Sequence, residues 1–499
     1  MEIRVWQRGL GAGLAAIAGG VVAALCAWPE RFIVDDAYFY LVTARNLALH
    51  GEQTFSQVWP TNGVHPLWLW LLAAWSWLVA RVDASWLFNA RSVLPPTLLL
   101  ATATALLALR LADRLALPRW PGAVLPVAFG LGLPLLGTEA ALSALTLAWA
   151  LHTWLDAHRS TRAALLFALA SALAVLSRLD NLFVIMALHG ALWLRPGHRR
   201  AQLWALLPLA AWLAVNAAQF GALVPVSGLL KSTFPQICAN GLQRDGINTA
   251  FSGYNLVFGW LPLLATAAVA VRLRRRAPAV AQLLAALAVG CAGHAAYTAL
   301  FTHHVGSWLW HYTVPVVMGA WALAAVAQHL VAIRWRPLAI AAMTLLPALA
   351  VAGYAARAAT RAQTGDEALR VRDWLHDNQV TDATLLVSDA QGAIAFASTN
   401  RVIGLDLLTA NPACVRTALA APNALESLLQ QARDAGHPID FIVLTSDTWL
   451  AKLWPMADGR ALEFAFLQPG TCGTRTRARL AVAAPVWQAP GLTVWRAPR

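Results

Sequence analysis

The chain has 499 residues, of which 59% are hydrophobic and only 12% are charged. Because soluble globular proteins carry about a quarter charged residues, this composition excludes a soluble enzyme, a disordered chain and a disulfide-rich secreted module. The formal net charge of +13 would suggest nucleic-acid binding in a soluble protein, but in so apolar a chain it indicates a multi-pass membrane protein with arginine in its cytoplasmic loops.

The first predicted element is a membrane span over about residues 9–28, which follows the short basic segment MEIRVWQR. No small-residue cleavage site precedes Arg31, so we interpret the segment as a retained helix and not as a removed signal peptide. Ten further apolar runs follow, which predicts about eleven transmembrane helices in all. These runs are 93–112, 121–137, 140–157, 163–177, 182–194, 201–219, 254–271, 279–301, 309–331 and 337–356.

The distribution of arginine predicts the topology. If Met1 is cytoplasmic, every second loop is cytoplasmic too, and those loops carry clustered arginines while the opposite loops carry few basic residues. This asymmetry requires that residues 65–80 do not cross the bilayer, so we expect a Trp-rich helix there that lies in the outer interface. An odd number of spans then places the C-terminus outside. The cytoplasmic arginines are Arg110, Arg114, Arg119, Arg159, Arg162, Arg195, Arg199, Arg200, Arg272, Arg274, Arg275, Arg276, Arg334 and Arg336.

A change in composition near Thr360 predicts two domains. Residues 1–360 would form an all-α polytopic membrane domain with a large first periplasmic loop at 31–92, and residues 361–499 a periplasmic α/β domain. In the second domain, EALRVRDWLHDN predicts an amphipathic helix, and TLLVSD and FIVLTSD predict buried strands. Cys414 and Cys472 both fall there, where an oxidising compartment would allow a disulfide between them if their geometry permits it.

The densest group of polar residues lies in the first outer loop. Asp35 and Asp36 follow the first span, and AYFYLVTARNLALHG after them predicts a short helix that stops at Gly51. In one interpretation Asp35 is the N-cap and Asp36 a first-turn carboxylate, and both only stabilise this helix. In the other, one carboxylate is a general base. Since adjacent side chains cannot both face one substrate atom, one would act on the acceptor while the other orients or caps.

Four more polar residues on the outer side each allow two interpretations. Lys231, the only lysine before the C-terminal domain, suits a cation that stabilises a departing phosphate, or a lysine that extends to the interface. Arg178 and Asp180 lie at the outer end of a span and would contact substrate or simply pair with each other. Glu139 would contact substrate or stabilise the start of a helix.

Histidines cluster near the last outer loop. His303, His304 and His311 lie in the segment FTHHVGSWLWHY, but their spacing matches no HExxH or similar metal motif. We therefore expect interface or phosphate contacts and assign no metal site, with a divalent metal as the less favoured alternative. His294, inside a span, is expected to be a hydrogen-bonded packing residue.

The first outer loop also shows a characteristic order of motifs. D-D-A-Y-F-Y-L-V-T-A-R-N-L is followed by Gly51, Phe55 and T-N-G-V-H-P-L-W. This order resembles the first periplasmic loop of GT-C-fold glycosyltransferases, multi-pass enzymes that use polyprenyl-phosphate sugars. Relatives include protein O-mannosyltransferases, the lipid A aminoarabinose transferase and mycobacterial arabinofuranosyltransferases. The family's acidic pair, Tyr/Arg helix and His-Pro correspond here to Asp35-Asp36, Arg45 and His65-Pro66.

Shorter segments resemble further elements of bacterial members of this group. They are GTEAAL at 137–142, SRLDN at 177–181, LVPVSGLLK at 223–231, and SDAQGAIAF with RVIGLDLL in the C-terminal domain. All of them fall on the outer side of the topology that the arginines predict, which adds weight to motifs that are individually short.

The resemblance implies a function and a site. A sugar would pass, with inversion, from a polyprenyl-phosphate carrier to an acceptor hydroxyl at the periplasmic face of a bacterial inner membrane. Asp35, at the first acidic position, would activate the acceptor, with Asp36 in support. The remaining roles would be divided between donor phosphate or lipid binding by Lys231, Arg178, His65 and Arg45, and substrate binding by Asn62, Tyr38, Glu139, Asp180 and His311.

The implied partners are the lipid-linked sugar, a glycan, lipid or protein acceptor, and membrane lipids, with no nucleic acid and no cofactor. The alternative function is a transporter or flippase of a lipid-linked sugar. Transporters often show internal repeats and broken helices at the midplane, whereas this chain shows no repeat and its acidic residues lie at the outer edge. A membrane scaffold would leave the polar motifs without a reason to share one side.

Overall fold

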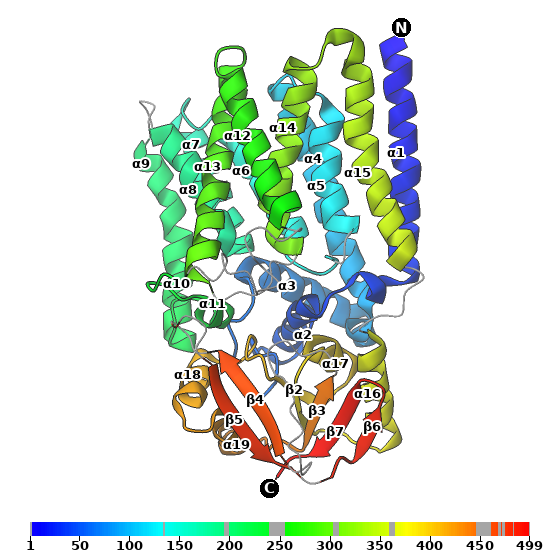
Figure 1. Ribbon diagram of the computed structural model, residues 1–499, viewed down its shortest axis with the longest axis vertical. Coiled ribbons are helices and arrows are strands. Elements are labelled where there is room, and N and C mark those ends of the chain that lie inside the picture. The colour runs from blue at the N-terminus through cyan, green and yellow to red at the C-terminus, as the bar shows by residue number, and fades with distance from the viewer. Residues whose placement is uncertain are drawn as a thin grey trace.

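The computed structural model describes residues 2–132, 135–193, 199–238, 255–302, 309–358, 365–445, 461–467, 471, 475–482 and 484–498. Each of the eleven apolar runs contains a helix, and these helices run side by side as a bundle (Figure 1). They are α1 (Glu2–Ala27), α4 (Leu94–Arg114), α5 (Arg119–Gly132), α6 (Ala140–Trp154), α7 (Thr161–Ser177), α8 (Leu182–Trp193), α10 (Leu206–Phe220), α12 (Leu261–Leu273), α13 (Pro278–Phe301), α14 (Thr313–His329) and α15 (Arg336–Ala358).

Small residues let neighbouring helices of the bundle approach closely. A Cβ added at Gly290 in α13 would lie 2.5 Å from the Cα of Val184 in α8. A Cβ added at Gly122 in α5 would lie 2.7 Å from the ring of Trp321 in α14. Because lipid provides no hydrophobic driving force between helices, such close contact is a main source of packing energy in a membrane bundle.

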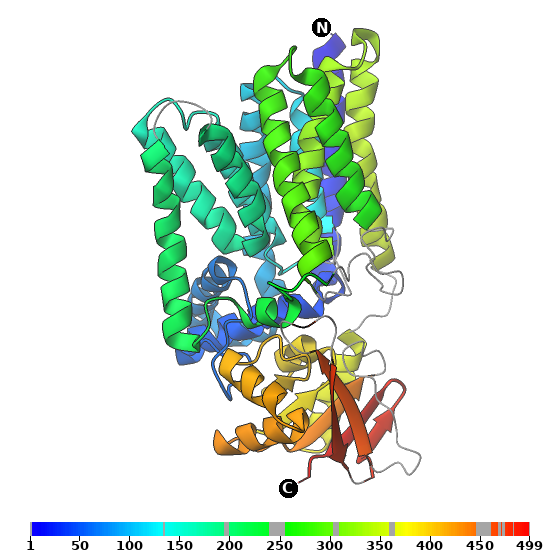
Figure 2. The same cartoon turned by 60° about the vertical axis from the view of Figure 1, so that its left-hand side comes forward.

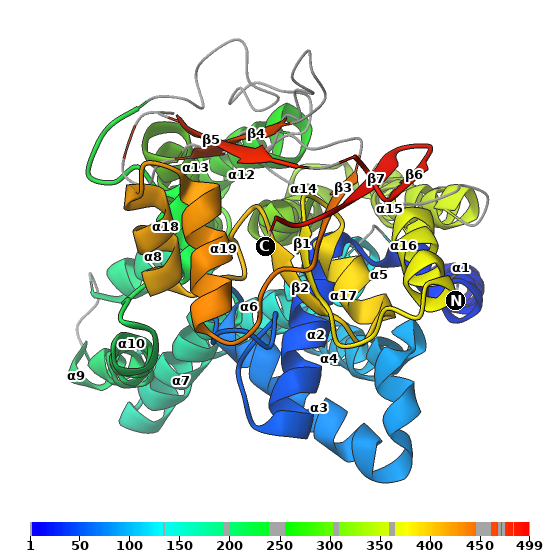
Figure 3. The same cartoon turned by 90° about the horizontal axis from the view of Figure 1, so that it is seen from below.

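Seven described helical segments are long and apolar enough to cross a membrane, judged by length and composition. The chain is therefore a mostly helical protein of multi-pass membrane type, while the number of about eleven spans stays a prediction. One of the seven segments, Pro66–Phe88, contains α3 (Pro66–Asp83), which was expected to lie in the interface. Figures 1 and 3 show α3 lying across the lower end of the bundle instead of along it.

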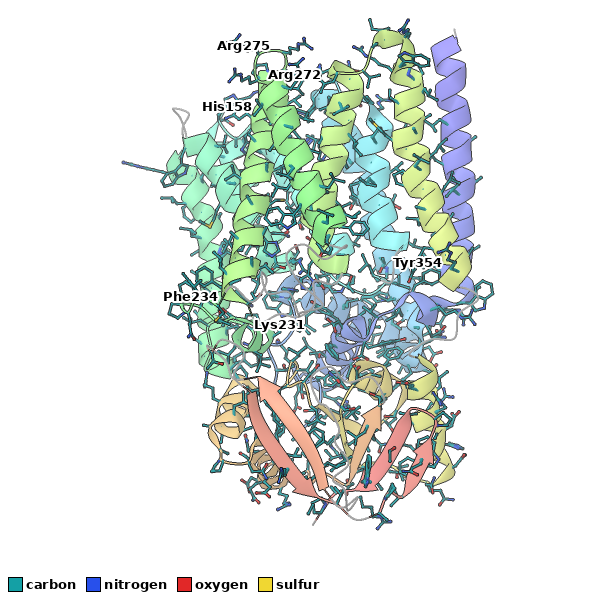
Figure 4. The ribbon with its side chains drawn as sticks, in the orientation of Figure 1. His158, Lys231, Phe234, Arg272, Arg275 and Tyr354 are labelled. Atoms are coloured by element: carbon teal, nitrogen blue, oxygen red, sulfur yellow. The ribbon has the colours of Figure 1, made fainter. Side chains whose placement is uncertain are left out.

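The two ends of the bundle differ in charge, as the arginine distribution predicts. Arg272, Arg275 and His158 lie at the upper end, near the N-terminus, whereas Lys231 lies at the lower end beside the C-terminal domain (Figure 4). The fold thus separates the arginine-rich loops from the end that carries the first outer loop. By the positive-inside rule, the upper end would be cytoplasmic.

This arrangement leads to a topology prediction. A reporter that is active only in the cytoplasm, fused after Arg499, is expected to be silent, while the same reporter in the loop at Arg275 is expected to be active. An active fusion at Arg499 would place the C-terminal domain in the cytoplasm and contradict the orientation.

A layer of helices lies between the bundle and the C-terminal domain (Figure 2). It contains α2 (Asp35–His50), α3 and α11 (Val226–Lys231). As expected, α2 stops at Gly51, whose φ of +74° gives the left-handed conformation that favours glycine at a helix end. The N-cap residue is Val34, not Asp35 as predicted, so both aspartates lie in the first turn of α2.

The C-terminal domain is an α/β unit, and the strands predicted at TLLVSD and FIVLTSD are both present. Its five-stranded sheet has the order β2-β1-β3-β7-β6; β1 pairs in parallel with β2 and β3, and β7 pairs antiparallel with β3 and β6. A separate antiparallel pair joins β4 and β5. The elements are α16 (Gly365–Asp377), β1 (Thr384–Val387), α17 (Gln391–Ala397), β2 (Arg401–Gly404), α18 (Pro412–Ala420), α19 (Ala424–Asp434), β3 (Phe441–Thr445), β4 (Ala461–Leu467), β5 (Arg475–Ala481), β6 (Trp487–Ala489) and β7 (Leu492–Arg496).

The disulfide that the sequence left open between Cys414 and Cys472 is not formed. Cys414 is a free, half-buried cysteine on α18, and Cys472 lies outside the described residues.

Candidate functional site

The polar residues of several sequence motifs meet at the lower end of the bundle, next to the C-terminal domain. Glu139 occupies the start of α6, and Arg178 and Asp180 lie at the short helix Leu179–Asn181 that joins α7 to α8. His65 immediately precedes α3, and Lys231 is the last residue of α11 (Figure 4). Helix termini from four different elements thus bring side chains far apart in sequence to one place.

The centre of this cluster is the buried Arg178. Its guanidinium donates to a carboxylate oxygen of Glu139 and, at 2.5 Å, to Oδ2 of Asp180, so the expected pairing of Arg178 with Asp180 is present and extends to Glu139. Burial disfavours the charge on Arg178, but the two carboxylates outweigh it and raise its pKa. The same pairing holds the pKa of Asp180 below its usual value despite burial. Two carboxylates thus pair with one buried guanidinium, so the Arg178 charge is not left unpaired.

Histidines surround this network. Nε2 of His65 lies 3.9 Å from Oε1 of Glu139, and Nε2 of His294 lies 3.8 Å from Oδ2 of Asp180. His311 acts electrostatically on Asp180, so it belongs to the same cluster. His294, expected only to pack, thus contacts the site, whereas His303 and His304 lie outside the described residues.

Asp36 and Lys231 belong to this cluster because Lys231 acts electrostatically on Asp36, and neither has a fixed partner among the described residues. Both side chains are partly exposed, and neither makes a hydrogen bond or ion pair with any residue in the described part of the chain. Burial raises the pKa of Asp36, Lys231 opposes that rise, and Glu139 adds to it. The Asp36 carboxyl therefore binds its proton more tightly than an ordinary aspartate does, and the Lys231 charge favours its ionised form.

Asp35 has different surroundings from Asp36. Its Oδ1 accepts the N–H of Ala393 at 2.8 Å and its Oδ2 that of Gly392 at 3.2 Å, so it binds the first turn of α17 in the C-terminal domain. A Cβ at Gly392 would lie 2.5 Å from the Asp35 carbonyl oxygen, so the approach requires glycine. Burial raises the pKa of Asp35, and the bond from Ala393 opposes this. Asp35 therefore caps the first turn of α17 and not the start of its own helix, α2.

Arg45 and Tyr38 hold the same helix. Arg45 is buried and donates to the carbonyl oxygens of Ala395 at 3.1 Å and Phe396 at 3.3 Å, near the end of α17. Burial lowers the pKa of Arg45 to about 10. The Tyr38 ring packs against Phe396 with centroids 5.0 Å apart. A carboxylate at the start of α17 and a guanidinium at its end both match the helix dipole, so these residues dock the C-terminal domain.

Asn62 positions the segment that leads to Lys231. Its Oδ1 accepts the N–H of Val226 at 3.0 Å, and its Nδ2 donates to the carbonyl oxygen of Val224 at 3.2 Å. The side chain is buried, so these bonds fix the start of α11. Asn62 therefore acts on the cluster through Lys231.

Several residues at this site belong to no role that the sequence motifs predict. Tyr40 lies one helical turn after Asp36, and its hydroxyl accepts the N–H of His65 at 3.4 Å and lies beside Glu139. That four-residue spacing was a usable signal, because it places Asp36 and Tyr40 on one face of α2. In the C-terminal domain, Asp406 accepts from Gln391 and from the N–H of Leu408, and burial raises its pKa to about 7.

No group of three or more His, Cys, Asp or Glu side chains is placed to hold a metal ion within the ranges that the structure describes. The donor set at the site instead combines carboxylates with the fixed charges of Arg178 and Lys231. Such a set suits a phosphate group and a hydroxyl group together.

The docking role of Asp35 is testable. Asp35→Asn keeps one acceptor oxygen but turns an amide group towards a backbone N–H, so we expect a loss of about 1–3 kcal/mol in the stability of the docked C-terminal domain. Thermal unfolding and limited proteolysis of the purified protein would measure it. Asp377→Asn, at an exposed position on α16, is the matched control and should have no effect. Wild-type stability in Asp35→Asn would contradict this role.

A scan against models of protein families finds no match, and a search of curated proteins finds none. Among solved structures, the chain is similar to a crystal structure of the Archaeoglobus fulgidus oligosaccharyltransferase tethered with an acceptor peptide containing the NVT sequon via a disulfide bond. The sequence identity is 13%, the TM-score is 0.45, and the match covers 87% of this chain and 69% of the other. A similarity at this level does not establish a family or a function.

Proposed function

We propose that this chain is a membrane glycosyltransferase that moves a sugar from a polyprenyl-phosphate carrier to an acceptor hydroxyl at the outer face of a bacterial inner membrane. The observation that carries the proposal is the pair of unpartnered, partly exposed groups of opposite charge, Asp36 and Lys231, at the end of an apolar bundle. Transfer from a lipid phosphate needs a base for the acceptor and a cation for the leaving group, and this pair provides both.

The proposed reaction is a single displacement. The acceptor oxygen attacks the anomeric carbon of the donor, and the bond between that carbon and the phosphate oxygen breaks. Asp36 takes the proton of the attacking hydroxyl, and the Lys231 ammonium stabilises the negative charge on the departing polyprenyl phosphate. Attack opposite to the leaving phosphate inverts the anomeric centre.

The Arg178 network has a positioning role in this proposal. Because Glu139 and Asp180 already pair with Arg178, its guanidinium is less available to a phosphate than the Lys231 ammonium is. The network ties the start of α6 to the connection between α7 and α8, and it lies beside His65. Fixed charges of this kind hold the reacting groups in place without reorganisation.

The proposal exchanges the roles that the resemblance implied for the two aspartates. Asp35 is occupied by two backbone N–H groups of α17, whereas Asp36 has no hydrogen-bond partner among the described residues. A general base must reach the substrate proton; Asp36 interacts electrostatically with Lys231, whereas Asp35 binds the C-terminal domain. We therefore assign the base to Asp36 and the docking function to Asp35.

Two features support the outer face as the location. The arginine-rich loops lie at the opposite end of the bundle (Figure 4), and Cys238, in the segment after α11, is disulfide-bonded. Disulfides persist in the periplasm and are rare in the cytosol. The donor would then reach the site from the outer leaflet, and the acceptor from the periplasm.

The test is a transfer assay with the full chain in proteoliposomes. A panel of polyprenyl-phosphate hexoses and pentoses is supplied with a mixed glycan and lipid acceptor fraction, and release of polyprenyl phosphate is measured. We expect release that depends on acceptor, and a product whose anomeric configuration is opposite to that of the donor. Movement of intact donor across the bilayer without cleavage would instead identify a lipid-linked sugar transporter and refute the proposal.

A further inference from the structure

A groove of about 450 Å³ opens between the first outer loop and the lower end of α10. Trp70 of α3 and Trp212 of α10 line it, together with four amide side chains, Gln53, Asn62, Asn216 and Gln219. None of the described residues that line it is charged. Its volume lies within the range of pockets that hold small ligands.

The lining restricts the chemistry of a ligand. A phosphate or a carboxylate would need a cation, and the groove offers none. An alkyl chain would leave the amides facing hydrocarbon, which is costly for polar groups. A neutral sugar ring matches both features of the lining, because its hydroxyls donate and accept hydrogen bonds and its C–H face packs against indole rings.

Several amide groups in the groove are available to a ligand. Nε2 of Gln53 donates to the carbonyl oxygen of Thr61, and Nδ2 of Asn216 donates weakly to that of Leu223, which leaves both side-chain oxygens without a donor among the described residues. Gln219 is exposed and makes no hydrogen bond with any described residue. Asn216 itself is only 3% exposed, so its orientation is fixed by packing.

The segment from Asn62 to Pro66 joins the groove to the cluster around Arg178. Val64 and Pro66 line the groove, and His65 between them turns its imidazole towards Glu139. Asn62 lines the groove and also holds the start of α11, which ends at Lys231. An oligosaccharide that is bound in the groove and extends past His65 would therefore run towards the cluster that contains Asp36.

We propose that this groove binds a neutral sugar unit of the acceptor, so that the acceptor is a glycan or glycolipid. The inference rests on the proposed function, since it names the acceptor class for the same site. It assigns the uncharged groove to acceptor recognition and the Lys231 end to the donor phosphate.

The experiment measures binding and needs no transfer. The full chain in lipid nanodiscs is titrated with fluorescent neutral gluco-, manno- and galacto-oligosaccharides, with a uronic-acid oligosaccharide as the anionic comparison. The variants are Asn216→Leu and Trp70→Ala. Trp77→Ala is the matched control, because Trp77 lies on the same helix and is 46% exposed, against 45% for Trp70, but is outside the groove.

We expect at least one neutral oligosaccharide to bind, and both groove variants to weaken its binding by about tenfold or more, the scale of one lost hydrogen bond or stacked ring. Trp77→Ala should bind like the wild type, and the uronic-acid oligosaccharide should bind less well. The inference is overturned if no neutral oligosaccharide binds more tightly than about 10 mM, or if the groove variants bind unchanged.

A parallel titration separates this result from the proposed function. Polyprenyl phosphate in the same nanodiscs should bind the wild type and lose affinity in Lys231→Ala. If polyprenyl phosphate binds in this way but no neutral oligosaccharide binds, the glycosyltransferase proposal stands and only the acceptor class is wrong. If oligosaccharides bind while polyprenyl phosphate does not, the groove stands and the donor proposal fails.

Discussion

Asp36→Asn is expected to lower sugar transfer by about 10²-fold or more, the usual contribution of a general base. Asparagine has nearly the same shape as aspartate but cannot accept the proton of the acceptor hydroxyl. The side chain makes no hydrogen bond with described residues, so the substitution should leave the fold unchanged. A transfer assay with purified variants, with a thermal melt for each, would measure the effect.

Two comparisons make this result specific. Asp377→Asn, at an exposed site in the C-terminal domain, should keep full activity. Asp35→Asn should lose stability and docking, with a smaller loss of transfer at temperatures where the domain stays docked. If Asp35→Asn abolished transfer with an unchanged melt while Asp36→Asn stayed active, the base would be Asp35, as the sequence resemblance implied.

The same assignment predicts a pH dependence. Because burial raises the pKa of Asp36, the carboxylate is lost at a higher pH than for an ordinary aspartate. Activity should therefore fall on acidification with a midpoint above 3.8, the usual value for aspartate. The acid limb of the pH–rate profile should disappear in the residual activity of Asp36→Asn.

Lys231→Ala is expected to lower transfer by about 10²–10³-fold, the scale found when one charge-stabilising group is removed from a water-poor active site. Lys231→Arg should keep part of the activity, because arginine preserves the positive charge but replaces the compact ammonium group with a planar guanidinium. Since Lys231 also favours the ionised form of Asp36, its removal should move the acid limb of the pH–rate profile to higher pH. A variant that lacked only an interfacial anchor would show no such shift.

A matched control for the charge is Arg433→Ala, on the exposed face of α19. It also removes one positive charge at this end of the molecule but should keep full activity. Wild-type turnover in Lys231→Ala would remove this lysine from the site, and equal losses in both variants would indicate a general effect of net charge.

The sequence predicts the helices well because each apolar run must satisfy its own backbone hydrogen bonds in lipid. It also predicts that the polar motifs share one end, since arginine marks the opposite end. The Arg178 pairing with Asp180 is local in sequence, and the structure adds Glu139 from a helix start 39 residues earlier.

The roles of Asp35 and Asp36 could not be separated from sequence. What distinguishes them is a pair of backbone N–H groups more than 350 residues later, and a backbone group leaves no mark in the sequence. The same holds for Arg45, whose partners are backbone carbonyl oxygens in α17. The one signal in the sequence is Gly392, a glycine that permits close approach of another segment. It does not show which residue approaches it.

The measurement that tests the central claim most directly is a cryo-EM map of the full chain in nanodiscs that contain polyprenyl phosphate. We predict density for the phosphate against the Lys231 ammonium, within reach of Asp36, with the prenyl chain leading into the outer leaflet. A phosphate bound at the arginine-rich end of the bundle, or at a site remote from both residues, would contradict it.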